Sequence, residues 1–197
     1  MRKKFLFTCL VVLFLVMIPL TSRSLFDIGL KVSTLYNGNQ EIETDGFFTG
    51  MSDGDNWSFG FGLEGRISIL HASVLAASVF GDENLMDLYY TAMVDIPIVH
   101  DVVYLSLGGG LSNQLDLPQE EDERLRFSNH SVDASFIEVV QDSLIHLQAS
   151  VDILLGPAVL SVFYLRETGS KIGNPIDQLF TSSGVNKGGV ALTLMLF

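Results

Sequence analysis

The sequence predicts an all-β fold, a transmembrane, antiparallel, up-and-down barrel of eight strands. Three observations favour this class. Apolar and polar residues alternate with period two along most of the chain, which is typical of strands with two different faces. The alternating segments are mostly about ten to thirteen residues long, and a tilted strand of that length spans a bilayer. Tight turns and longer polar loops alternate between them, which places both termini of the mature chain on the tight-turn side.

The first 24 residues, MRKKFLFTCLVVLFLVMIPLTSRS, are typical of a secretory signal peptide. Basic residues at positions 2–4 precede an apolar run from Phe5 to about Leu20, and small residues surround a cleavage site after Ser24. An uncleaved anchor helix is the alternative, because the run is only slightly shorter than a membrane span. We therefore divide the chain into a signal peptide, residues 1–24, and one barrel domain, residues 25–197.

Composition restricts the partners and the sources of stability. The chain is apolar, with 48% hydrophobic residues and a mean hydropathy of +0.38, yet it carries a net charge of −12. The charged residues of the signal peptide are all basic, so the mature chain is more acidic still. A strongly acidic chain is an unfavourable partner for nucleic acid. The only cysteine, Cys9, lies in the signal peptide. We expect no disulfide in the mature barrel, which then depends on backbone pairing and packing.

The first two predicted strands show the alternation most clearly. Residues 26–36, FDIGLKVSTLY, place aromatic and aliphatic side chains mainly on one face and small or charged ones on the other. Residues 57–69, WSFGFGLEGRISI, repeat this division with a more aromatic stripe. The remaining predicted strands are residues 71–80, 86–98, 101–112, 143–154, 158–167 and 187–197.

The connections differ in length and composition. Strands two and three meet near ILHAS, four and five across VHD, and six and seven across LGP, which predicts three tight turns. The other connections are long or polar, and the third, residues 113–142, contains a faint helical period that predicts a short helix over the barrel mouth or an outward extension of strand six. The glycines at 108–110 lie inside a strand and have no neighbouring lysine, so they indicate curvature or close packing instead of a phosphate loop.

With its signal peptide, even set of alternating strands, loop asymmetry and terminal Phe197 in GGVALTLMLF, the mature chain resembles the small eight-stranded outer-membrane barrels of the OmpA, OmpX and OmpW kind. The resemblance is architectural, since no motif is diagnostic of one family. It implies a bacterial outer-membrane location, in contact with outer-membrane lipids. It also implies that Phe197 and its strand are the signal read by the barrel-assembly machinery and the seam that closes against the first strand.

A soluble, lipocalin-like periplasmic barrel is the alternative, with its apolar face turned inward. Few charges lie in the predicted strands, and two of the strands are apolar on both faces, which favours the membrane. The aromatic residues also fall into two expected girdles. The periplasmic girdle is Phe26, Tyr104 and Phe197, and the external girdle is Tyr36, Trp57, Phe80, Tyr89 and Tyr90.

The face opposite the aromatic stripe predicts a polar network in the lumen. An eight-stranded barrel is just wide enough for side chains to fill it, and buried charges must be paired. We expect the network to consist of Lys31, Glu64, Arg66, Asp95, His146 and Asp152, with Asp27, Tyr89, Tyr104 and Gln148 on the same face. Its predicted role is a structural ion-pair plug, and a narrow or gated ion path is the alternative.

No catalytic residue, cofactor or metal site is predicted. His146 and Ser150 share a face, but four residues along a strand separate them by about 13 Å, beyond hydrogen-bond reach. The acidic segments SDGDNW and QEEDER lack the spacing of a calcium loop, and we interpret them as solvated loops.

The expected function is therefore that of a non-enzymatic membrane scaffold, a surface-exposed envelope protein with acidic external loops. Transport of a small, hydrophobic solute is the alternative that resemblance to the OmpW kind implies. It depends on an apolar lumen. The second faces of the last two strands are apolar and favour such a lumen; their residues are Val159, Phe163, Leu192, Leu194 and Leu196. A lipid-modifying enzyme is the third hypothesis. The sequence identifies neither a solute nor an external ligand.

Overall fold

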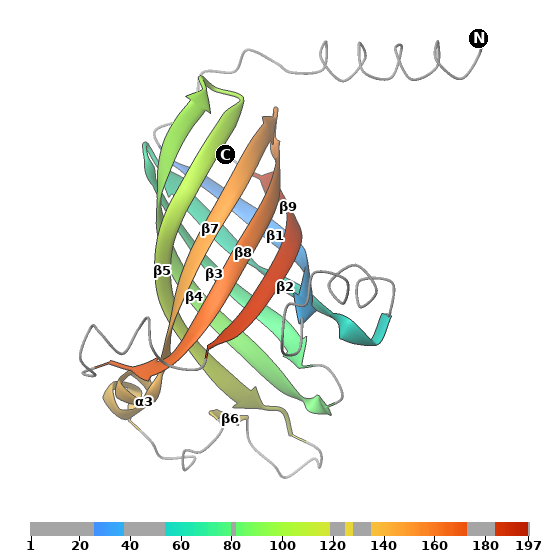
Figure 1. Ribbon diagram of the computed structural model, residues 1–197, viewed down its shortest axis with the longest axis vertical. Helices are drawn as coiled ribbons and strands as arrows, with labels where there is room; N and C mark the ends of the chain where they lie inside the picture. Colours follow the sequence, from blue (N-terminus) through green and yellow to red (C-terminus); the bar gives the residue numbers. More distant parts are fainter. Residues whose placement is uncertain are drawn as a thin grey trace.

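The structure is a computed structural model that describes residues 26–37, 54–79, 82–118, 125–127, 135–172 and 184–196. The expected signal peptide, Phe80, Phe197 and most of the acidic loop segments lie outside the described residues. Eight long antiparallel strands form a closed, tilted barrel (Figure 1). They are β1 (Asp27–Asn37), β2 (Trp57–Ile67), β3 (Leu70–Val79), β4 (Asp82–Val99), β5 (Val103–Asp116), β7 (Leu144–Leu155), β8 (Ala158–Lys171) and β9 (Val185–Met195).

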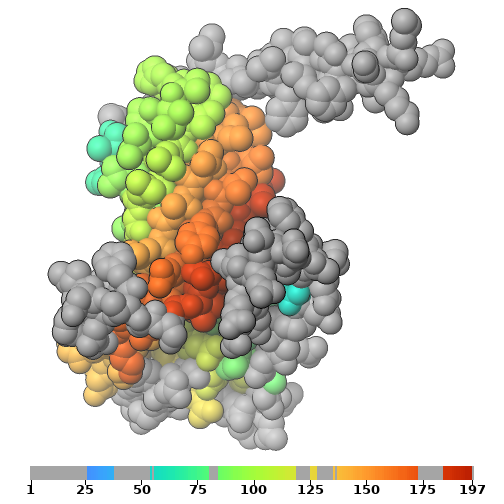
Figure 2. All heavy atoms as spheres, in the orientation of Figure 1, coloured from blue at the N-terminus to red at the C-terminus, as the bar shows by residue number. Residues whose placement is uncertain are grey.

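The barrel closes between its first and last strands. β1 pairs with β9 from Gly29 opposite Met195 to Asn37 opposite Lys187. Every other long strand pairs with its neighbours in chain order, and β5 pairs with β7 across the third loop. Figure 2 shows β7, β8 and β9 as a continuous wall on one face of the molecule. The predicted all-β, eight-stranded, up-and-down barrel is confirmed, including the seam formed by the last strand. Closure matters because a closed sheet has no unpaired edge.

The three predicted tight turns are present at one end of the barrel. Ser68, Asp101 and Gly156 each adopt a positive φ, of 56°, 59° and 68°, which allows the chain to reverse within two or three residues. At the opposite end lie the short strand β6 (Arg126–Phe127), the 3-10 helix η1 (Gly54–Asn56) and the helix α3 (Phe136–Asp142).

Helix α3 is the short helix that the faint period in the third loop predicts. Its start is fixed by a capping box, in which the Ser135 hydroxyl accepts from the Glu138 amide and the Glu138 carboxylate accepts from the Ser135 amide. No helix among the described residues is long and apolar enough to cross a membrane.

Side chains alternate between an apolar exterior and a polar interior. Large hydrophobic residues such as Phe59, Phe61 and Val162 are 69%, 64% and 55% exposed on the outer surface. Their neighbours along each strand point inward, and most of the buried polar side chains lie there. This arrangement is the reverse of the one expected for the soluble, lipocalin-like alternative.

Tyr89 and Tyr104, which the sequence places both in a girdle and on the lumen face, point into the barrel. Tyr89 is 1% and Tyr104 is 4% exposed, because each falls on the inward parity of its strand. Phe26 and Tyr90 do lie on the outer surface, at 49% and 37% exposure.

The second apolar face expected on the last two strands is present on β8 and absent from β9. Leu192, Leu194 and Leu196 are exposed on the outside. Val159 and Phe163 of β8 are buried inside the barrel. The inward face of β9 carries small and polar residues, so the lumen is less apolar than the hypothesis of solute transport requires.

The three consecutive glycines of β5 allow close contact with both neighbouring strands. A Cβ atom on Gly108 would lie 2.1 Å from the Ala92 carbonyl oxygen, and one on Gly110 would lie 1.7 Å from that of Tyr90. Both distances are shorter than any van der Waals contact. A side chain at either position would therefore force β4 and β5 apart.

Candidate functional site: the charged lumen

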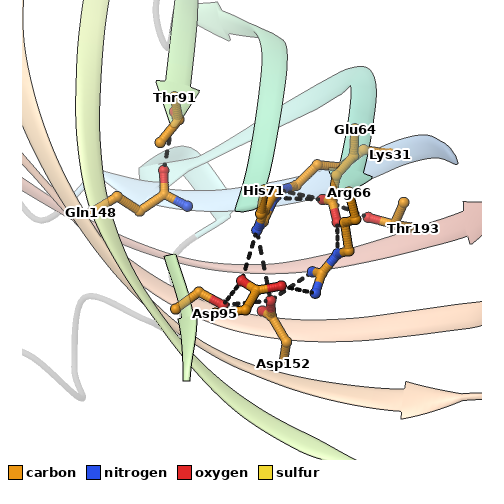
Figure 3. A network of polar contacts seen from close by, with 10 residues as sticks. Lys31, Glu64, Arg66, His71, Thr91, Asp95, Gln148, Asp152 and Thr193 are labelled. Atoms are coloured by element: carbon orange, nitrogen blue, oxygen red, sulfur yellow. Dashed lines mark hydrogen bonds and ion pairs between the residues drawn. The ribbon is translucent and has the colours of Figure 1, made fainter. Parts of the chain in front are cut away.

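Charged side chains gather inside the barrel near the tight turns (Figure 3). We call Lys31, Glu64, Arg66, His71, Asp95 and Asp152 the turn-end cluster. They come from β1, β2, β3, β4 and β7, and all are 3% exposed or less. The pairing register brings them together, since Arg66 lies directly opposite His71 and both point inward.

Arg66 is the centre of the turn-end cluster. Its Nε donates to Glu64 Oε1 at 2.8 Å, one terminal nitrogen donates to Asp95 Oδ2 at 3.0 Å, and the other donates to Asp152 Oδ2 at 2.6 Å. A planar guanidinium can serve several carboxylates at once, which a lysine ammonium on the same strand could do less well. Arg66 therefore links three strands, β2, β4 and β7.

The other side of Glu64 is held by β1 and β9. Lys31 Nζ donates to Glu64 Oε2 at 3.1 Å, and the Thr193 hydroxyl donates to the same oxygen at 3.1 Å. The Thr193 hydrogen bond crosses the seam where the first and last strands meet. The seam is thus fixed by buried side chains as well as by the backbone ladder.

His71 joins this cluster although sequence reasoning did not assign it there. Its Nε2 lies 3.3 Å from Glu64 Oε2, and its Nδ1 lies 3.6 Å from Asp95 Oδ1 and 3.9 Å from Asp152 Oδ2. In the sequence His71 sits in ILHAS, which predicts a turn. Alternation along the strand could have identified His71, because it points inward on β3 like Ser73, Leu75 and Ala77.

A second group of polar side chains lies towards the loop end of the lumen. We call Asp87, Tyr89, Glu167 and Lys187 the loop-end cluster. Lys187 Nζ donates to Asp87 Oδ2 at 2.9 Å and to Glu167 Oε1 at 3.2 Å, and the Tyr89 hydroxyl donates to Glu167 Oε1 at 2.8 Å. Of these residues, only Tyr89 was assigned to the lumen from the sequence.

The structure separates His146 from the other predicted network residues. Its Nε2 lies 3.0 Å from the Thr91 hydroxyl, and its ring packs edge-on against Tyr89 at 5.6 Å. The Thr91 hydroxyl also donates to Gln148 at 3.4 Å. The other five residues, Lys31, Glu64, Arg66, Asp95 and Asp152, are brought together.

A cluster of apolar side chains lies in the lumen between the two charged clusters. They are Leu35, Leu75, Ala77, Tyr89, Phe163, Leu165 and Ala191, all buried in mutual contact. The Lys31 ammonium lies 5.9 Å from the centre of the Phe163 ring, which connects this layer to the turn-end cluster. The lumen thus contains two charged clusters with an apolar layer between them, and the polar side chains of Thr91, His146 and Gln148 lie beside that layer.

Comparison with known proteins identifies the fold. No family model matches this sequence, and no curated protein does. The crystal structure of the N-terminal β-barrel domain of Pseudomonas aeruginosa OprF is similar, with a TM-score of 0.52 and 6% identity over 86% of this chain and 97% of that one. The crystal structure of Neisserial surface protein A (NspA) matches with a TM-score of 0.43 and 12% identity over 88% and 99%. The chain has the fold of a small eight-stranded outer-membrane barrel.

Proposed function

We propose that this chain is an integral outer-membrane protein that acts as a non-enzymatic, non-conducting scaffold in the cell envelope. The observation that carries the membrane part is the apolar outer surface. Phe59, Phe61 and Leu63 of β2 are each more than half exposed, and exposed apolar side chains on the other strands of the barrel continue this apolar outer belt. Contiguous apolar surface on this scale is unfavourable in water and favourable in lipid.

The closed backbone supports the same proposal. In hydrocarbon every backbone donor and acceptor must be paired within the protein. Only an α-helix or a closed β-barrel achieves this. The pairing of β1 with β9 leaves no open edge in the ring of eight strands.

The filled lumen supports a scaffold more than a channel. An ion crossing the barrel would have to pass the turn-end cluster, the apolar layer and the loop-end cluster in turn. Separating Arg66 from any of its three carboxylates leaves a buried charge without its partner, which is strongly unfavourable. The proposed role of the lumen is therefore structural.

The absence of catalysis is part of the proposal. His146 and Ser150 lie on the same strand, and the His146 Nε2 is occupied by Thr91 instead of a serine hydroxyl. A nucleophile needs a base within about 3.2 Å, and residues four apart on a strand are about 13 Å apart.

Planar-bilayer recording tests the scaffold against the channel. Residues 25–197 are refolded in detergent and added to a lipid bilayer at increasing protein concentration, with a known porin as positive control. We expect no discrete conductance steps. Regular steps in proportion to the inserted protein would contradict the scaffold and favour the ion path.

We further propose that outer-membrane lipids surround the barrel and that the strand ending at Phe197 is recognised by the barrel-assembly machinery. Deletion of Phe197 in a Gram-negative expression host should lower the amount of folded barrel in the outer membrane while leaving refolding in detergent unchanged. Equal amounts of folded protein with and without Phe197 in the membrane would contradict this part.

A further inference from the structure

One corner of the turn-end cluster has the composition of a metal site. His71 from β3, Asp95 from β4 and Asp152 from β7 point towards one spot (Figure 3). One ligand atom of each lies within 4.8 Å of the other two, and all three residues are buried. An imidazole nitrogen and two carboxylate oxygens are a donor set that divalent transition metals bind in proteins.

The distances in this corner are too long for hydrogen bonds. His71 Nδ1 lies 3.6 Å from Asp95 Oδ1 and 3.9 Å from Asp152 Oδ2, whereas a hydrogen bond between nitrogen and oxygen is about 2.7–3.2 Å long. Neither His71 Nδ1 nor Asp152 Oδ1 has a hydrogen-bond partner within the described part of the chain. Two ligands of one tetrahedral zinc ion, each bonded at about 2.0–2.1 Å, lie roughly 3.3–3.4 Å apart. The two spacings from His71 Nδ1 would therefore contract by roughly 0.2–0.6 Å, and the two carboxylate oxygens, within 4.8 Å of each other, would also move closer.

The other ring nitrogen of His71 also faces a carboxylate, although it too forms no hydrogen bond within the described part of the chain. Nε2 faces Glu64 Oε2 at 3.3 Å. A metal-binding histidine commonly donates its second N–H to a carboxylate, which fixes the tautomer and turns the free lone pair to the metal. With its proton on Nε2, His71 would direct the Nδ1 lone pair at two carboxylates, and this repulsion is relieved when a cation lies between them.

Arg66 and Ser106 together hold three of the four oxygens of the two aspartates. Arg66 binds Asp95 Oδ2 at 3.0 Å and Asp152 Oδ2 at 2.6 Å, and Ser106 donates to Asp95 Oδ1 at 2.7 Å and to Asp152 Oδ2 at 3.0 Å. Asp152 Oδ1 stays available. The three carboxylates of the turn-end cluster exceed its two permanently charged cations, Lys31 and Arg66, so with a neutral His71 the cluster carries one net negative charge that a metal ion would offset.

We propose that His71, Asp95 and Asp152 bind one divalent transition-metal ion of the Zn²⁺ type, with water as the remaining ligand. The ion would join β3, β4 and β7 at the tight-turn end of the barrel. Since it binds the folded state, it stabilises the barrel by mass action. The proposal does not depend on membrane insertion or on conductance. The site forms no sequence motif, because its three ligands come from three different strands.

Bound metal is measured directly. Residues 25–197, free of any affinity tag and carrying His100→Gln to remove the exposed turn histidine, are refolded in detergent with zinc chloride and dialysed. Zinc is then quantified by plasma mass spectrometry. We expect one ion per chain, and less than a tenth of an ion after His71→Gln. His146→Gln is the matched control and should keep the ion, because His146 is also buried in the lumen but its contacts within the described residues include no carboxylate.

The folded state of each sample is checked by its shift in gel migration on boiling, which separates loss of metal from loss of fold. Absence of zinc from the folded parent protein would overturn the proposal and leave His71 as a charged member of the ion-pair cluster. Retention of zinc by folded His71→Gln would overturn it as well. If His71→Gln does not fold, X-ray absorption of the zinc-loaded parent decides. One nitrogen ligand with oxygen ligands is expected, and two or more histidines in the fit would refute the site.

Discussion

Replacement of Arg66 by methionine should destabilise the barrel more than any exposed charge substitution. Arg66 is 2% exposed and binds carboxylates of Glu64, Asp95 and Asp152 at 2.6–3.0 Å. Removal of one partner from a buried ion pair costs about 3–5 kcal/mol, because the remaining charge stays buried. Here three carboxylates lose their shared cation, so we expect a loss near the upper end, about 5 kcal/mol. Methionine keeps most of the side-chain volume, so the loss reports charge and not a cavity.

The loss can be measured by urea unfolding of the barrel refolded in lipid vesicles. Trp57, the only tryptophan, packs against Tyr36 at a ring distance of 5.5 Å and reports the folded state by its fluorescence. The control is Lys171→Met. Lys171 pairs with Asp142 at 2.7 Å but both side chains are 51% exposed, so the expected loss is less than about 1 kcal/mol.

A second test separates charge from packing. Adding Asp95→Asn and Asp152→Asn to Arg66→Met should recover part of the lost free energy of unfolding, because the orphaned carboxylates are then neutral. If Arg66→Met costs no more than Lys171→Met, the turn-end cluster does not stabilise the fold and the structural role proposed for the lumen is refuted.

Three further substitutions test the packing, the turns and the outer surface by the same unfolding assay. Gly108→Ala should lower the free energy of unfolding by about 1–3 kcal/mol, because its Cβ would lie 2.1 Å from a carbonyl oxygen. Gly188→Ala should be close to neutral, because its Cβ would have no atom within 4 Å. Equal effects of the two substitutions would contradict the close packing of β5. Ser68→Gly should stabilise the barrel by up to about 1 kcal/mol by relieving a positive φ, and a clear loss would speak against that turn. Val162→Arg, on the outer belt, should cost about 2–4 kcal/mol in lipid, and no loss there would indicate that this surface faces water.

The strands and tight turns could be predicted because period-two alternation and chain reversal are local signals. The inward parity of Lys31, Glu64, Arg66, Asp95 and Asp152 follows from alternation alone once each strand is recognised. Their convergence on one level of the barrel required the register, which depends on pairing between strands far apart in the sequence.

The strand ends were harder to predict. β4 begins at Asp82, within GDEN, which as a polar stretch predicts a loop. The same ambiguity concealed the loop-end cluster, since Lys187 and Glu167 lie close to the ends of the predicted strands, where charges usually indicate solvent. Only the closed barrel places them opposite Tyr89.

Segments that are apolar on both faces could not be oriented from the sequence. In VALTLMLF the leucines alternate with Ala191 and Thr193, and either set could face the lumen by composition. Pairing with β1 decides, because Thr193 lies opposite the inward-facing Lys31. Once that pair is fixed, all the leucines of the strand face outward, since one step of register reverses every side chain.

Membrane insertion is the central claim, and migration on a gel after refolding with lipid vesicles tests it most directly. Residues 25–197 are diluted from urea into buffer with or without vesicles, and each sample is run boiled and unboiled. We predict a compact, detergent-resistant band that shifts on boiling and forms only when vesicles are present. A chain that folds to a soluble monomer without lipid or detergent would contradict the claim and make a periplasmic barrel the correct account.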